Sequence, residues 1–149
     1  MSVPAPEAGF VVDCSVSAAW LFEEQADDYT EAALDALASA PALAPGSWIL
    51  EMLNVLLMLE RRRRLTASDA VQALRLLRRL PVHLQAAQAG PIELHALASR
   101  HQLTSYDAVY LNLALTSGLP LATRDKALAR AATDCGVGVW APDPGELTP

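Results

Sequence analysis

The fold is decided by the stretch Phe10-Val11-Val12-Asp13, in which three apolar residues are followed at once by a carboxylate. A short continuous apolar run is typical of a strand that is buried on both faces of a parallel sheet. Either Ser15 or Asp13 is placed to cap a helix that we expect to run through residues 18–21. The stretch therefore predicts a buried strand that ends at an acidic side chain.

Short apolar runs alternate with helical segments along the rest of the chain. We expect strands at 82–84, 119–122 and 137–140, and an extended connection or very short strand at 41–45. The expected helices cover 27–37, the apolar stretch from 47, 66–79, 91–98, 104–118 and 125–135. Such alternation predicts an α/β fold with a central short-stranded parallel sheet flanked by helices. We expect one domain over residues 1–149, with mobile ends at 1–8 and 142–149.

Length and composition fit one domain with a substantial core, since 149 residues are 52% hydrophobic. The longest apolar stretch runs from Trp48 to Leu59 and is interrupted by Glu51. A bilayer span needs about 20 apolar residues, so we expect no membrane segment. The N-terminus does not resemble a signal peptide, and the two cysteines do not have the spacing of metal ligands. A reduced, cytoplasmic protein is the simplest interpretation.

Charge is distributed unevenly along the chain. The net charge is −6, yet the first 60 residues contain no Lys or Arg, and basic residues then crowd into 61–64 and 75–79. Such a basic stripe is suited to a polyanion, while the acidic half is suited to a cation. Arginines at a helix end also complement the helix dipole without any ligand. Both interpretations stay open at this point.

Four carboxylates lie among apolar neighbours: Asp13, Glu51, Asp107 and Asp125. A buried unpaired carboxylate costs several kcal/mol, and few cations are near enough in sequence to pair all four. One hard divalent cation would satisfy several of them, because such ions prefer oxygen ligands. A simpler alternative for the three aspartates is helix capping, and for Glu51 a core polar pair with Asn54, which shares its helix face.

Two of these acids follow predicted strands, namely Asp13 and Asp125. The carboxyl ends of parallel strands share one edge of a sheet, which is where such folds bind ligands. We therefore expect the four acids to meet in one pocket and to disturb one another's pKa values by repulsion.

The motifs around these acids resemble those of the PIN-domain ribonucleases, and most of all the VapC toxins of bacterial toxin–antitoxin pairs. The resemblance covers about residues 10 to 141 and is carried by Val12-Asp13-Cys14-Ser15, Glu51-Met52-Leu53-Asn54, Leu103-Thr104-Ser105-Tyr106-Asp107-Ala108-Val109-Tyr110 and Leu121-Ala122-Thr123-Arg124-Asp125-Lys126-Ala127-Leu128. It implies a parallel sheet flanked by helices, with the acids at one end. It also implies cleavage of RNA that depends on Mg²⁺ or Mn²⁺.

The resemblance assigns roles to individual residues. The catalytic acids would be Asp13, Glu51, Asp107 and Asp125. We expect Asp13, Asp107 and Asp125 nearest the metal, with Glu51 assisting a water molecule. Polar neighbours expected to orient the carboxylates are Ser15, Asn54 and Thr123. Contacts to RNA phosphates are expected from Arg61, Arg62, Arg124 and Lys126.

The sequence also predicts two protein partners, a second copy of the chain and an antitoxin. The apolar helix at 48–59 predicts a homodimer, and a cognate antitoxin would place Arg or Lys near the acids. The main alternative is a catalytically silent PIN-like module that binds RNA or protein. A haloacid-dehalogenase phosphatase is disfavoured, because its second Asp would stand where this chain has Ser15. A phosphoacceptor receiver domain is disfavoured because it needs paired acids early in the chain, and Glu23 and Glu24 lie too far along to be that pair.

Overall fold

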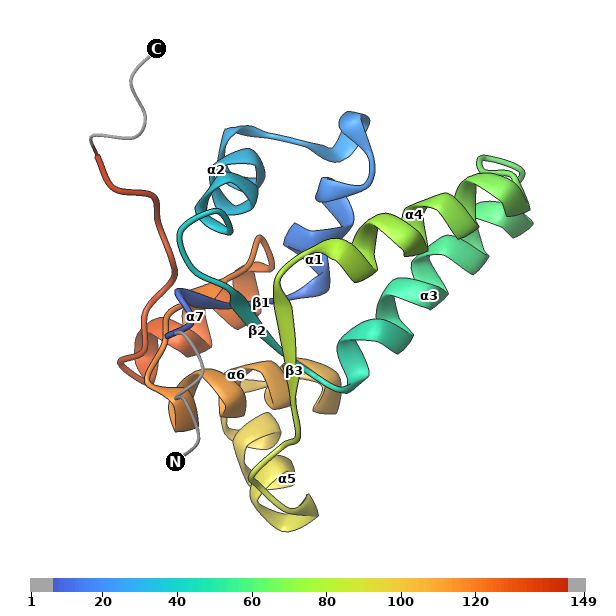
Figure 1. The fold of residues 1–149 in the computed structure, drawn as a ribbon. Coiled ribbons are helices and arrows are strands. Elements are labelled where there is room, and N and C mark those ends of the chain that lie inside the picture. Colours follow the sequence, from blue (N-terminus) through green and yellow to red (C-terminus); the bar gives the residue numbers. More distant parts are fainter. Residues whose placement is uncertain (1–6, 145–149) are drawn as a thin grey trace, which may run out of the picture.

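Four short strands form the centre of the molecule and pair in parallel in the order β3-β2-β1-β4 (Figure 1). The computed structural model describes residues 7–144. The strands are β1 (Phe10–Val12), β2 (Ala42–Pro45), β3 (Val82–Gln85) and β4 (Leu121–Ala122). The helices are α1 (Cys14–Ser17), α2 (Asp28–Ala36), α3 (Ser47–Arg61), α4 (Ala67–Arg79), α5 (Pro91–His101), α6 (Ser105–Ser117) and α7 (Lys126–Asp134), with 3₁₀ turns η1 (Ala18–Trp20) and η2 (Glu23–Gln25). The predicted α/β fold is confirmed.

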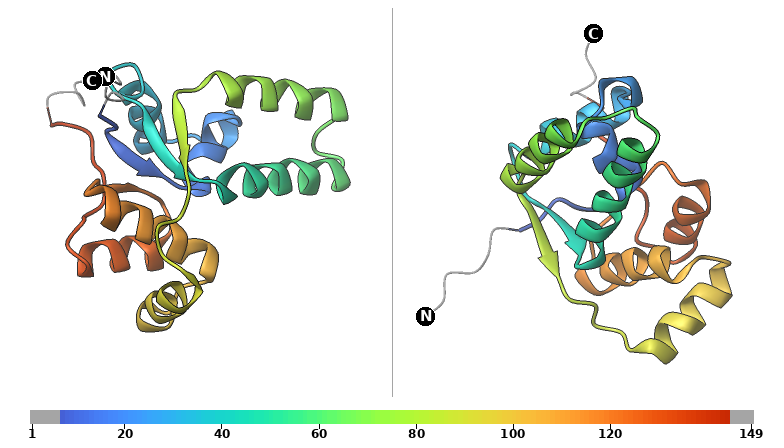
Figure 2. Two further views of the ribbon diagram at one scale, coloured as in Figure 1. Left: turned by 60° about the horizontal axis from the view of Figure 1, so that its bottom comes forward. Right: turned by 90° about the vertical axis from the view of Figure 1, so that its right-hand side faces the viewer.

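Strand β1 is a central strand, and all of its residues are buried. Its register places Phe10 opposite Ala42 of β2 and Val11 opposite Leu121 of β4. Helices cover both sides of the sheet, with α1 and α2 on one side and α6 on the other, and α5 and α7 pack against α6 (Figures 1 and 2). This two-sided cover explains why the strand is apolar at every position.

Helices α3 and α4 form an antiparallel pair that extends away from the sheet (Figure 2). The pair has its own small core of Leu56, Ala70 and Ala73. Thr66 caps α4, since its side chain accepts a hydrogen bond from the Asp69 N–H at 3.1 Å. The basic run lies at the far end of this pair, where α3 ends at Arg61.

Two predicted elements differ from the structure. The first helix does not continue to Leu21, because α1 ends at Ser17 and the 3₁₀ turn η1 follows. In η1 the Trp20 indole donates to the Thr30 carbonyl at 2.9 Å, which holds the turn against α2. The predicted strand at 137–140 is wrong: this segment pairs with β4 only through a single bridge, between Leu121 and Val139. The glycines at 136 and 138 have φ of +81° and +76°, so the segment cannot stay extended.

Within residues 7–144, no helix is long and apolar enough to cross a bilayer. The end segments predicted to be mobile, 1–8 and 142–149, lie mostly outside the described residues.

Candidate metal centre

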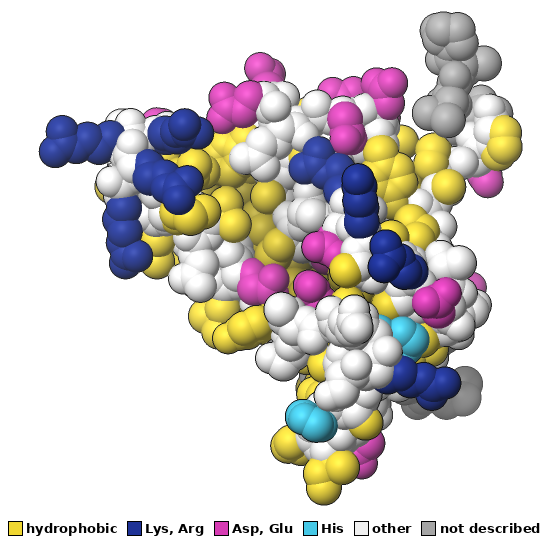
Figure 3. Space-filling model, turned by 180° about the vertical axis from the view of Figure 1, so that it is seen from behind, with side chains coloured by type: hydrophobic (Ala, Val, Ile, Leu, Met, Phe, Trp, Pro, Cys, Tyr) yellow, Lys and Arg dark blue, Asp and Glu magenta, His cyan; other side chains and the backbone are white. Residues whose placement is uncertain are grey.

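The fold brings the four predicted acids to the edge of the sheet where the strands end. Asp13 directly follows β1, and Asp125 follows the neighbouring strand β4. Glu51 lies in α3, which begins one residue after β2, and Asp107 lies in the first turn of α6. Acidic side chains gather in the middle of one face, with some basic side chains beside them and another basic group at one end of that view (Figure 3).

Asp13 is the most buried of the four acids, with 5% of its surface exposed. Its Oδ1 accepts hydrogen bonds from Ser15 Oγ at 2.6 Å and from the Val16 N–H at 3.2 Å. Its Oδ2 accepts a hydrogen bond from Thr123 Oγ1. Three donors from two segments of the chain therefore fix the orientation of this carboxylate, and the predicted roles of Ser15 and Thr123 have a geometric basis.

The backbone after β4 determines the direction of both hydroxyl protons. Ser15 Oγ accepts the N–H of Arg124 at 2.9 Å, and Thr123 Oγ1 accepts the N–H of Asp125 at 3.0 Å. A hydroxyl that accepts one hydrogen bond has its own proton free to donate elsewhere. Both protons therefore point at the Asp13 carboxylate, which stabilises its charged form.

Burial raises the pKa of three of the acids. The pKa of Asp13 is raised by desolvation, which the Ser15 and Thr123 hydroxyls partly offset, and the charge of Asp107 raises it further. The pKa of Asp107 is raised by desolvation and then by the charge of Asp125. Repulsion between the acids is therefore present, as predicted, but burial is the larger cause.

Glu51 has one buried carboxylate oxygen without a partner among the described residues. Its pKa is raised first by desolvation, with smaller contributions from the charges of Asp107 and Asp13. The Cys14 thiol and the Tyr110 hydroxyl lower it in part. The oxygen that lacks a hydrogen-bond partner in the described chain is Oε1. A buried acceptor without a donor is a site for a cation or a bound water molecule.

A hard divalent cation fits this set of donors. The groups are carboxylate oxygens whose charges disfavour one another, and one oxygen lacks any partner. Within residues 7–144, no three His, Cys, Asp or Glu side chains are close enough to hold a metal ion together. Mg²⁺ usually binds one or two carboxylates directly and keeps several waters, so it does not need such a group.

Two of the aspartates do cap helices, as the simpler alternative expected. Asp13 caps α1, and Asp125 caps α7 by accepting the Leu128 N–H at 2.8 Å. Asp107 is different, because its own N–H donates to Thr104 Oγ1 at 3.1 Å. The Thr104 hydroxyl also lowers the pKa of the Asp107 carboxyl, so the capping residue acts on the carboxylate too, although burial and the charge of Asp125 raise that pKa more.

The other predicted residues lie farther from these contacts. Asn54 is exposed and donates no hydrogen bond to an acid in the described chain. Around the helix axis Asn54 is about 60° from Glu51, and Asn54 is exposed whereas Glu51 is partly buried. Arg61, Arg62 and Lys126 are exposed.

Two contacts that support Asp13 were missed from the sequence. The Trp48 indole donates to Ser17 Oγ at 2.8 Å, and Ser17 Oγ donates to the Asp13 carbonyl at 2.7 Å. The spacing of four residues between Asp13 and Ser17 was the available signal, because a helical serine often bonds the carbonyl one turn earlier.

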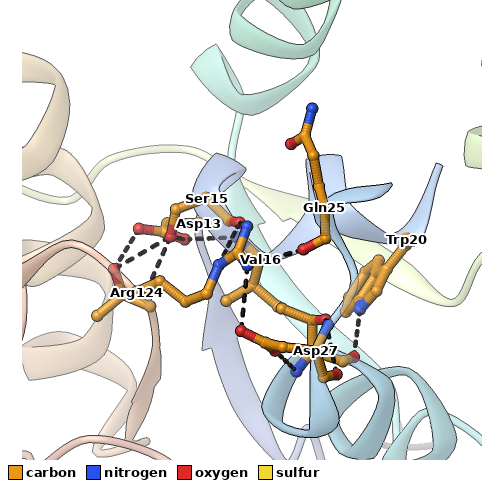
Figure 4. A network of polar contacts seen from close by, with 9 residues as sticks. Asp13, Ser15, Val16, Trp20, Gln25, Asp27 and Arg124 are labelled. Atoms are coloured by element: carbon orange, nitrogen blue, oxygen red, sulfur yellow. Dashed lines mark hydrogen bonds and ion pairs between the residues drawn. The ribbon is translucent and has the colours of Figure 1, made fainter. Parts of the chain in front are cut away.

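Arg124 has partners that the sequence did not indicate (Figure 4). Its Nε and Nη2 donate to the Ser15 carbonyl at 3.2 and 2.8 Å. Its Nη1 donates to the Gln25 carbonyl at 2.8 Å and to Asp27 Oδ2 at 3.2 Å. Asp27 also caps α2 by accepting the Thr30 N–H at 2.8 Å, and its pKa is lowered first by that N–H and then by Arg124.

Comparison with known proteins agrees with this geometry. A family model described as PIN domain matches residues 10–134. The chain is 35% identical over 133 residues to Ribonuclease VapC3 of Mycobacterium tuberculosis, in both strain CDC 1551 / Oshkosh and strain H37Rv, which covers 87% of this chain and 92% of the relative. The crystal structure of PAE2754 from Pyrobaculum aerophilum shares the fold, with a TM-score of 0.68, 22% identity and coverage of 86% of this chain and 87% of that one. The chain therefore belongs to the PIN domain family, as a member of the VapC type.

Proposed function

We propose that this protein is a metal-dependent endoribonuclease that acts as the toxin of a toxin–antitoxin pair. Its curated relatives are named ribonucleases of the VapC type. The observation that carries the proposal is the set of four acids on this fold, with Asp13 buried and oriented by two hydroxyls. Acids that repel one another at one edge of the sheet would oppose the binding of RNA, which is itself a polyanion, so they do not suit a protein that only binds RNA.

The roles of the acids follow from their surroundings. Asp13, Asp107 and Asp125 would hold Mg²⁺ or Mn²⁺, one or two of them directly and the others through bound waters, with Ser15 and Thr123 keeping Asp13 charged and in place. The metal supplies an acidified water molecule and neutralises charge that develops on the phosphate. Glu51 has a raised pKa and a free oxygen, so it is suited to accept a proton from the attacking water. Asn54 would orient a carboxylate only after a side-chain rotation.

RNA has to approach a net acidic protein. The exposed Arg61, Arg62 and Lys126 would contact phosphates and offset the repulsion from the acids. Single-stranded loops are the usual targets of sequence-specific RNA recognition, because their bases are accessible.

We also propose a homodimer and an antitoxin partner. Helix α3 exposes three large apolar side chains, with Leu50 63%, Leu57 42% and Met58 43% accessible, and we place the dimer contact there. The antitoxin would bring an Arg or Lys to the four acids, where a cation replaces the metal and blocks cleavage.

The test is cleavage of an RNA hairpin with a single-stranded loop, with Mn²⁺ or with EDTA. We expect Mn²⁺-dependent cleavage by the wild-type protein and none by Asp13→Asn or Asp107→Asn. Asp35→Asn, at an exposed position on α2, is the matched control and should cleave normally. Binding without cleavage in the presence of Mn²⁺ would favour the silent RNA-binding module, and cleavage undiminished by EDTA would exclude the metal mechanism.

A further inference from the structure

Arg124 connects the segment after β4, which carries Asp125, to the start of α1, next to Asp13, and its ion pair with Asp27 joins both to α2. The segment after β4 contributes Thr123 and Asp125 to the site, and Arg124 stands between them. The guanidinium of Arg124 does not extend into solvent as a phosphate-binding arginine would. It donates instead to three residues in two other segments of the chain, Ser15 in the first and Gln25 and Asp27 in the second.

Each of these contacts fixes one segment relative to the next. The fork of Nε and Nη2 around the Ser15 carbonyl holds the start of α1, which also carries the hydroxyl on Asp13. The bond from Nη1 to the Gln25 carbonyl holds η2. The ion pair with Asp27 then ties the group to α2, because Asp27 is itself anchored there in a reciprocal capping box with Thr30.

We propose that the Arg124–Asp27 pair is a positioning clamp, which sets the distance between Asp13 and Asp125 and thereby the affinity of the site for its divalent metal. The inference rests on the proposed function. Arg124 then affects metal binding through the β4–α7 connection and does not contact RNA directly.

The two roles of Arg124 predict opposite effects of a change at Asp27. If Arg124 bound phosphate, removal of the Asp27 charge would free the guanidinium and make the surface less acidic, so RNA would bind more tightly. If Arg124 is a clamp, the same change loosens the connection that carries Asp125, so the metal binds less tightly. Outer partners of metal ligands typically change metal affinity by about 10- to 100-fold.

Asp27→Asn is the decisive variant. Asparagine is about as good a helix N-cap as aspartate, so the cap of α2 is retained. With its Oδ1 on the Thr30 N–H, the new amide nitrogen faces the guanidinium, and two donors cannot bond each other. Asp28→Asn is the matched control, since the neighbouring acid is exposed and carries the same charge. Arg124→Lys retains the positive charge but lacks the fork that holds the Ser15 carbonyl.

The experiment measures Mn²⁺ binding by calorimetry and cleavage of the hairpin RNA over a range of Mn²⁺ concentrations. We expect Asp27→Asn and Arg124→Lys to weaken Mn²⁺ binding by roughly 10-fold. At saturating Mn²⁺ their KM for RNA should equal that of the wild-type protein, and Asp28→Asn should be unchanged in both measurements. Melting curves verify that each variant is folded, and Asp27→Asn decides the matter if Arg124→Lys does not fold.

Wild-type Mn²⁺ affinity in Asp27→Asn, or a lower KM for RNA, would overturn the clamp while leaving the proposed nuclease intact. A wild-type protein that neither binds Mn²⁺ nor cleaves RNA would instead overturn the proposed function, and the clamp with it.

Discussion

Thr123 Oγ1 donates a hydrogen bond to Asp13 Oδ2, and this contact joins residues that stand 110 positions apart in the chain. It is possible because β1 and β4 are neighbours in the sheet and both end at the same edge. The same Thr123 oxygen accepts the N–H of Asp125, so one hydroxyl links two of the four acids. The site is thus organised by the chain segment after β4 as much as by Asp13 itself.

Replacing Thr123 with valine tests this link directly. Valine has nearly the same shape but leaves Asp13 Oδ2 without its donor and the Asp125 N–H without an acceptor, while Ser15 and Val16 still donate to Asp13 Oδ1. Hydrogen bonds to charged groups contribute about 1.5–3 kcal/mol, so the free energy of unfolding should fall by about 2 kcal/mol in urea titrations. Thr123→Ser keeps the hydroxyl and is the control, and equal losses in both variants would mean that packing, not the hydrogen bond, is responsible.

Metal binding should stabilise the folded protein. Only the folded state gathers the acids, so Mn²⁺ at about 100 times its dissociation constant should add about 2.7 kcal/mol and raise the Tm. Asp107→Asn should shrink this shift, and in the absence of metal it should have a Tm equal to or above that of the wild-type protein, because one repelling charge is removed. A full Mn²⁺ shift in Asp107→Asn would contradict its role as a ligand.

Stability without metal should depend on pH in a defined direction. The folded-state pKa values of Asp13, Glu51 and Asp107 are raised, so the folded protein binds more protons than the unfolded chain above the ordinary values of 3.8 and 4.5. Stability therefore falls as the pH rises from these values through the raised pKa values. The lowered pKa of Asp27 has the opposite sign, but its contribution changes only below 3.8.

This pH dependence is measurable by urea unfolding in EDTA between pH 5 and pH 8, a window chosen as roughly one to four units above the ordinary carboxyl values. We expect lower stability at the upper end, and a smaller decrease in Asp13→Asn. Saturating Mn²⁺ should reverse the trend, since metal binds the deprotonated acids. Stability that rises with pH in EDTA would contradict the raised pKa values.

The proposed dimer makes a separate prediction. Leu57→Glu places a charge on the exposed apolar side of α3 and should convert the dimer to a monomer in sedimentation experiments at tens of micromolar, a range in which weak interfaces are still occupied. Ile92→Glu is the control, because Ile92 is 82% exposed on the distant helix α5. A wild-type monomer at this concentration would exclude the interface.

The sequence was sufficient to predict the main strands, most helix starts and the position of Asp13 and Asp125 after neighbouring strands. It succeeded there because buried strands are continuous apolar runs and because Thr66 and Thr104 are strong local caps. The break after α1 and the loss of the strand at 137–140 depend on tertiary contacts and on glycines with positive φ. Arg124 and Asp27 are 97 positions apart in the chain, and no local sequence pattern predicts a contact over that separation.

The account depends most on a metal ion held by the acids at the sheet edge. Anomalous diffraction from crystals grown with Mn²⁺ tests this directly, because the metal is located without reference to activity. We predict an anomalous peak among the carboxylates of Asp13, Asp107 and Asp125, and its loss in Asp13→Asn crystals. A strong Mn²⁺ peak elsewhere on the protein, with none between these three side chains, would contradict the account.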